Sequence, residues 1–257
     1  MSEDSVKLRT PLHVRRVHPL RTLMWLRRGW LDFMNAPLIG VLHGLAAAGF
    51  GAVILALAWD KFWLLAGAFS GFLLVAPGLL TGLYAVSRAM HRGEPVGFKT
   101  VWSVWARFDR RLATFGLLLM LAGTGWVLTS AAFITLNVHP AVTTPVDFLR
   151  RVVLSKESGL FEMWLMLGGV MAAPVFASSI VAIPLMMDRQ VGVMRAVLTS
   201  WRTVMVNPIA MALWAAVIMS LSLFGLATLL LGLVLIVPVL GHAHWHAYQD
   251  LVVRETL

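Results

Sequence analysis

The sequence predicts an all-α membrane protein that crosses the bilayer with six helices. Three observations predict this class: 59% of the 257 residues are hydrophobic, only 13% are charged, and the apolar residues are gathered in long uncharged runs. Soluble domains are typically about 45–50% apolar and about 25% charged. The chain has no cysteine, which excludes disulfides and thiolate metal sites.

The uncharged runs define the expected spans. One crossing needs about 20 residues, and four runs meet that length: Leu38–Trp59, Phe62–Ser87, Leu112–Leu136 and Met163–Met187. The stretch Pro208–Ala247 has 40 residues without a charge, about twice the length of one crossing. It predicts a hairpin of two spans that turns between Ser220 and Thr228.

The distribution of Lys and Arg predicts the orientation of the spans. The terminal segments and the connections 88–111 and 188–207 hold 17 of the 21 basic residues, whereas the opposite side holds Lys61, Arg150, Arg151 and Lys156. Cytoplasmic loops of membrane proteins carry the excess of basic residues. We therefore expect a multi-pass protein of the bacterial inner membrane with both termini in the cytoplasm. The net charge is +9, and the basic residues that cause it flank the spans. This arrangement favours contact with anionic lipid headgroups and excludes nucleic acid as a partner.

Three tryptophans indicate an internal repeat. Apolar residues recur at the same offsets around Trp30, Trp105 and Trp201, which predicts three amphipathic helices lying at the cytoplasmic interface. Each would precede a transmembrane hairpin. A cytoplasmic tail, residues 1–20, would precede a single membrane domain, residues 21–257, with repeat units of about 21–88, 95–188 and 190–250.

Prolines occupy recurrent positions in these units. Pro37 and Pro208 would each stand at the first position of a span, with Asn207 as an N-cap. The second span of each unit also contains proline: Pro77, then Pro174 and Pro184, then Pro238. Proline removes a backbone hydrogen bond and kinks a helix. The kinked helices either enclose a central space or simply shape the packing.

Histidines gather where the last span meets water. His242 and His246 are four residues apart and share one helix face, and His43 should lie at a similar depth in the first span. One interpretation is a metal, haem or proton site formed by His242, His246 and His43. The other is interfacial anchoring or hydrogen bonding between helices. We expect His242 to be buried with a polar partner, either His43 or one of Thr81 and Tyr84, and His244 to face lipid headgroups or another subunit.

Glycine and the remaining polar residues favour packing over chemistry. Gly40 and Gly44 form a small-xxx-small step that allows close approach of helices. No nucleophile–base pair, phosphate loop or carboxylate dyad is visible, so an enzyme is poorly supported.

Several of these segments resemble a known family. The segments Arg27–Trp30, Asn35–Pro37, Trp201–Pro208 and Val237–Tyr248 resemble a bacterial family of integral membrane proteins built on a domain of unknown function. Members are sometimes labelled cytochrome c oxidase subunits. The resemblance implies a six-span inner-membrane protein and brings no site residues with it.

The leading interpretation is a non-enzymatic accessory or assembly factor linked to a respiratory complex, without a cofactor. Its partners would be the bilayer and either another membrane protein or further copies of itself. One alternative is a small-solute or ion permease, and another is a haem or copper binder that uses the histidine cluster.

Overall fold

The computed structural model describes residues 12–58, 79–155 and 159–254. These residues are mainly helical, as the sequence predicts. The helices are α2 (Arg21–Asn35), α3 (Pro37–Ala58), α5 (Phe98–Trp105), α6 (Arg110–Asn137), α7 (Pro145–Phe148), α8 (Leu160–Ser179), α9 (Ala182–Asp188), α10 (Val193–Val206), α11 (Pro208–Ala227) and α12 (Leu233–Leu251). A π-helical turn, Leu149–Val153, follows α7, and residues 79–91 are also helical.

Four helical stretches in the described part of the chain are long and apolar enough to cross a membrane: Pro37–Ala56, Arg110–Asn137, Leu160–Asp188 and Pro208–Ala227. The final helix, α12, is not among them, because its second half carries three histidines, Gln249 and Asp250. Most of the expected span Phe62–Ser87, including Pro77, lies outside the described residues. The layout of six spans in three repeats therefore stays a prediction.

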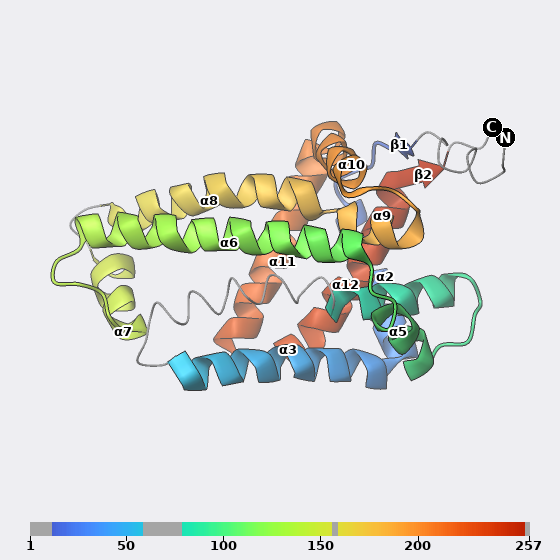
Figure 1. Cartoon of the computed structure of the whole chain (residues 1–257), viewed down its shortest axis with the longest axis horizontal. Helices are drawn as coiled ribbons and strands as arrows, with labels where there is room; N and C mark the ends of the chain where they lie inside the picture. Colours follow the sequence, from blue (N-terminus) through green and yellow to red (C-terminus); the bar gives the residue numbers. More distant parts are fainter. Residues whose placement is uncertain (1–11, 59–78, 156–158, 255–257) are drawn as a thin grey trace.

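A short β-ladder joins the two ends of the described chain. Strand β1 (Leu12–Val14) pairs antiparallel with β2 (Val252–Arg254). Both strands lie at the same end of α6 and α8 as α9, whereas α7 lies at the opposite end (Figure 1). Strands of three residues carry too little pattern to be detected in a sequence, so this pair was not predicted.

Pro37 and Pro208 begin α3 and α11, as predicted. Asn207 occupies the N-cap position of α11 as predicted, but its side chain makes no capping hydrogen bond to that helix. Asn207 Oδ1 instead accepts from the backbone nitrogen of Val17 at 2.8 Å, and Nδ2 donates to the carbonyl of Arg15 at 3.0 Å. Asn207 thus fastens the segment after β1 to the start of α11.

The α11–α12 hairpin turns later than predicted. Helix α11 continues to Ala227, and the turn occupies residues 228–232. Thr228 Oγ1 donates to the carbonyl of Phe224 and accepts from the nitrogen of Gly232 at 2.9 Å. These bonds satisfy backbone groups at the end of α11, which allows an apolar stretch to turn there.

The fourth predicted span, Met163–Met187, lies within the stretch Leu160–Asp188, and a turn at residues 180 and 181 interrupts its helix. Helix α8 contains Pro174 and ends at Ser179, and α9 begins at Ala182. Proline lacks an N–H and clashes with the carbonyl four residues earlier, which for Pro184 is Ile180, inside the break. Pro184 therefore accounts for the break, and α8 passes through Pro174 uninterrupted.

Three helices stand before spans where the sequence predicts amphipathic helices: α2, α5 and α10. Trp30, Trp105 and Trp201 are 45%, 44% and 39% exposed. Their neighbours differ, because Trp105 packs on His43 whereas Trp201 Nε1 donates to Ser178 Oγ. Trp105 is also the last residue of α5, whereas the other two tryptophans lie within their helices. The repeat stays a prediction on these observations.

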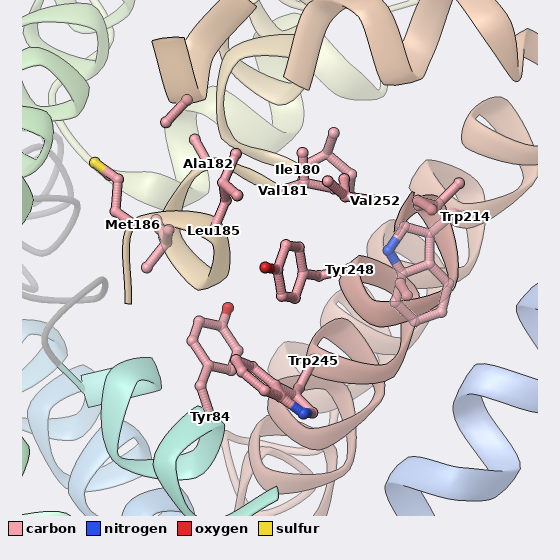
Figure 2. Packing of buried hydrophobic residues seen from close by; sticks show 14 of the residues in the cluster. Tyr84, Ile180, Val181, Ala182, Leu185, Met186, Trp214, Trp245, Tyr248 and Val252 are labelled. Carbon is pink, nitrogen blue, oxygen red and sulfur yellow. The ribbon is translucent and has the colours of Figure 1, made fainter. Parts of the chain in front are cut away.

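The core is built around α12. Its second half carries the buried aromatic residues Trp245 and Tyr248, and Tyr84 packs against Trp245 (Figure 2). Glycines bring α12 into backbone contact with its neighbours: a methyl group on Gly44 of α3 would lie 2.2 Å from the carbonyl oxygen of Val234. The predicted close packing at Gly44 is confirmed.

Candidate functional site

The candidate site is a chain of hydrogen bonds between α2, residues 79–91 and α12. Asp32 of α2 is its central acceptor. Ser87 Oγ donates to Asp32 Oδ2 at 2.6 Å, and His246 Nε2 lies 2.8 Å from the same oxygen. A carboxylate only accepts, so His246 Nε2 is the donor. The side chains of Asp32 and His246 are 14% and 13% exposed.

His242 extends the chain into the core. It is completely buried, and its Nδ1 lies 2.7 Å from Ser87 Oγ. Since the hydroxyl proton of Ser87 goes to Asp32, His242 Nδ1 donates to Ser87, and this assigns the tautomer. Nε2 of His242 then carries a lone pair, and it has no hydrogen-bond partner among the described residues.

His43 is held in a similar way on α3. It is buried, and its Nδ1 donates to the carbonyl of Ile39 at 2.7 Å. Its Nε2 also lacks a hydrogen-bond partner in the described chain, and it lies so close to Gly82 that a methyl group there would be 2.5 Å away. No hydrogen bond joins His43 to His242, because Nδ1 of each contacts another group and neither Nε2 has a partner in the described chain. His242 is therefore buried with a polar partner as expected, but that partner is Ser87.

Burial and hydrogen bonding act in opposite directions on Asp32. Burial alone raises the pKa of a carboxyl group, because it disfavours the charged form. Hydrogen bonds from His246 and Ser87 outweigh that effect and hold the pKa of Asp32 below its ordinary value of 3.8. Asp32 is thus a carboxylate at neutral pH.

The expectation that His244 faces lipid headgroups or another subunit is wrong, because its ring packs inside its own chain. Its ring stacks on Tyr84 with centroids 6.0 Å apart and lies 6.3 Å from the ring of Trp214. The aromatic core on that side of α12 provides these neighbours. Tyr248, on the same face, donates to Asp188 Oδ2 at 2.8 Å.

Among the residues that the structure describes, no group of three His, Asp or Glu side chains is arranged to hold a metal ion. His246 turns its Nε2 to Asp32, while His242 and His43 contact Ser87 and Ile39. The metal interpretation of these three histidines stays a prediction, and the observed contacts connect helices.

Comparison with known proteins finds one family that part of the chain matches. Residues 64–188 match the family described as "Predicted integral membrane protein (DUF2189)". The expected resemblance to a membrane family with a domain of unknown function is confirmed for these residues. No curated protein and no solved structure matches the chain.

The DUF2189 region includes Ser87 and Asp188, but neither α2 nor α12. The final-helix residues that suggested the resemblance therefore lie outside the matched range. The match and the four long apolar helices together support an integral membrane protein.

Sequence analysis missed Asp32 and Ser87 as members of this site. Asp32 follows the basic residues Arg27 and Arg28 on α2, which favours a solvent-exposed position. In the structure Asp32 instead lies beside the buried face of α2, which carries Thr22, Trp25, Gly29 and Phe33. Small and aromatic residues three or four positions apart on α2 were the signal in the sequence for a buried face there, because small residues allow another helix to approach closely.

A second polar cluster fastens α2 to α12 one turn further on. Asp250 accepts from Arg21 Nε and Nη2, both at 2.7 Å, and from Trp25 Nε1 at 3.1 Å. Arg15 forms a further ion pair with it. The Asp250 side chain is only 4% exposed, so its charge is neutralised inside the protein.

Proposed function

We propose that this protein is a non-enzymatic accessory protein of the bacterial inner membrane that assists the assembly of a respiratory complex. The observation that carries the proposal is the contact between Asp32, Ser87 and the two α12 histidines. Their polar groups are directed at one another and connect three helical segments. An active site would direct such groups at a space where a substrate binds.

Further contacts fix the positions of the residues at one end of the protein. Asp250 and the β1–β2 pair hold the two ends of the described chain together. We propose that this end is cytoplasmic, which the distribution of basic residues supports. It would present the outward-facing apolar residues of α2 and α10, among them Leu23 and Met194, to the bilayer or to a membrane-protein partner.

Deleting the gene in the organism that encodes the protein tests the proposal. Membranes of the deletion strain should contain less assembled terminal oxidase, measured by reduced-minus-oxidised spectra and oxygen uptake. Asp32→Asn should complement poorly, because it removes the negative charge of the central acceptor and leaves one accepting oxygen, whereas the exposed-residue control Arg28→Gln should complement fully. Unchanged oxidase content in the deletion strain would overturn the respiratory role.

A specific observation favours haem or copper binding as a second candidate. Metal-ligating histidines usually bind through one ring nitrogen while the other donates to an oriented acceptor. His43 and His242 both have this arrangement: Nδ1 donates, and Nε2 is buried without a partner in the described residues. Metal analysis and an absorbance spectrum of the purified protein test it, with His242→Ala as the variant and the exposed His139→Ala as the control. A metal content that is the same in both variants would refute a role for His242.

A further inference from the structure

A cavity of about 340 Å³ lies at the end of the protein that carries the β-strands. Three helical ends meet around it: the end of residues 79–91, the end of α9 and the last turns of α12, with β2 beside them. Three arginines line it, Arg88, Arg92 and Arg189, together with His91. Asp188 is the one carboxylate in its lining. None of the residues of the Asp32 hydrogen-bond chain lines this cavity.

The positive charge in this lining exceeds the negative charge. Asp188 is already engaged by the hydroxyl of Tyr248. Arg92 Nη2 lies 3.5 Å from Asp188 Oδ1, and Arg189 Nε lies 3.8 Å from Oδ2. Charged hydrogen bonds between nitrogen and oxygen are about 2.7–2.9 Å long. Asp188 therefore binds the Tyr248 hydroxyl closely and the two arginines only loosely.

Backbone carbonyls fix the positions of two of these arginines, and Arg92 Nη1 also lies 3.9 Å from Glu94 Oε1, outside the lining. Arg88 Nη1 donates to the carbonyl of Met187 at 3.1 Å, and Arg189 Nη2 donates to the carbonyl of Val252 at 3.2 Å. Burial, together with repulsion by Arg92, lowers the pKa of Arg88 below that of a free guanidinium. A bound anion would relieve the repulsion within this lining.

We propose that this cavity binds a phosphate group, carried either by a lipid headgroup or by a soluble phosphate compound. Guanidinium groups bind phosphate oxygens through two parallel N–H donors. Two of the three arginines are held by backbone carbonyls, so little side-chain freedom is lost on binding. The volume lies within the range of ligand sites, about 300–1,000 Å³. Trp245 and Val253 supply apolar lining for the group that bears the phosphate.

Calorimetric titration of the purified full-length protein in a non-ionic detergent tests the proposal. The two probes are inorganic phosphate and a short-chain phosphatidylglycerol, with sodium chloride at equal ionic strength as the blank. Binding of phosphate alone indicates a soluble phosphate compound, and binding of the lipid alone indicates a headgroup. If both bind, phosphate should displace the lipid, because they occupy the same site. Binding of neither probe overturns the proposal.

Charge variants connect the binding to the cavity. Arg92→Gln should weaken binding about tenfold or more, since it removes a charged hydrogen bond from a half-exposed side chain. Arg28→Gln changes the net charge equally at an exposed position outside the cavity and should leave binding unchanged. Asp188→Asn should tighten binding, because it removes the competing carboxylate. Equal affinities for Arg92→Gln and Arg28→Gln, or weaker binding by Asp188→Asn that stays folded, would place the anion elsewhere.

Discussion

Replacing Gly29 by alanine tests the packing of α2 on α12. A methyl group on Gly29 would lie 2.6 Å from the backbone nitrogen of Ala243 and 2.6 Å from the carbonyl oxygen of Val239. Both are backbone atoms of α12, so only a separation of the two helices relieves the clash. We expect Gly29→Ala to destabilise the protein.

The control for this substitution is Gly49→Ala in α3, where an added methyl group meets no atom of the described residues within 4 Å. Alanine favours a helix interior over glycine by about 1 kcal/mol, and this gain applies to both variants. Overpacking typically costs about 1–3 kcal/mol, and this cost applies to Gly29 alone. The free energies of unfolding of the two variants should therefore differ by about 1–3 kcal/mol, with Gly49→Ala the more stable.

The measurement is the apparent unfolding temperature of each variant in one detergent, followed by loss of the monodisperse peak in size-exclusion chromatography after heating. A further variant, Gly29→Val, should unfold at a lower temperature still, because its side chain is larger. Equal stability of Gly29→Ala and Gly49→Ala would show that α2 does not pack on α12 as the structure places it.

Three further predictions follow from the polar contacts and the charge distribution. Because the pKa of Asp32 is lowered on folding, its stabilising contribution is present above the ordinary carboxyl pKa of 3.8 and is lost as the pH falls through the lower folded value. Asp32→Asn should therefore lower the unfolding temperature at neutral pH, and acidification should lower the unfolding temperature of this variant less than that of the wild type. Parallel pH profiles of the two proteins would contradict this. Asp250→Asn should destabilise the protein by about 1–3 kcal/mol, because Arg21 and Trp25 lose a charged acceptor, and wild-type stability in thermal unfolding would refute that role. A reporter fused after Leu257 should be active in the cytoplasm, and activity only in the periplasm would show that the predicted orientation and the even number of spans are wrong.

Local pattern was sufficient to predict much of the fold. Proline at the first position of a helix needs no tertiary partner, so Pro37 and Pro208 marked the starts of α3 and α11. Turns inside an apolar stretch have no such signal. The α11–α12 turn was therefore placed too early, since it depends on the contacts of Thr228.

The candidate site was predicted in part. The position of His242 in an apolar helix was enough to predict burial with a polar partner, because an unpaired buried imidazole is costly. Which partner it has depends on the rotation of each helix about its axis. A run that is apolar all round does not fix that rotation. Ser87, rather than His43, meets His242 for this reason.

The sequence by itself determined that this protein is helical and crosses a membrane, because composition and run length alone set the cost of leaving each segment in water. It also showed where charged groups gather along the chain. Only the tertiary structure brought Asp32 to His246 and Asp250 to Arg21, pairs more than two hundred residues apart. Such contacts, like the cavity between Arg92 and Arg189, depend on how closely the helices approach one another, for example at Gly29. How two helices pack depends on the surfaces of both, so no single segment of the sequence determines it.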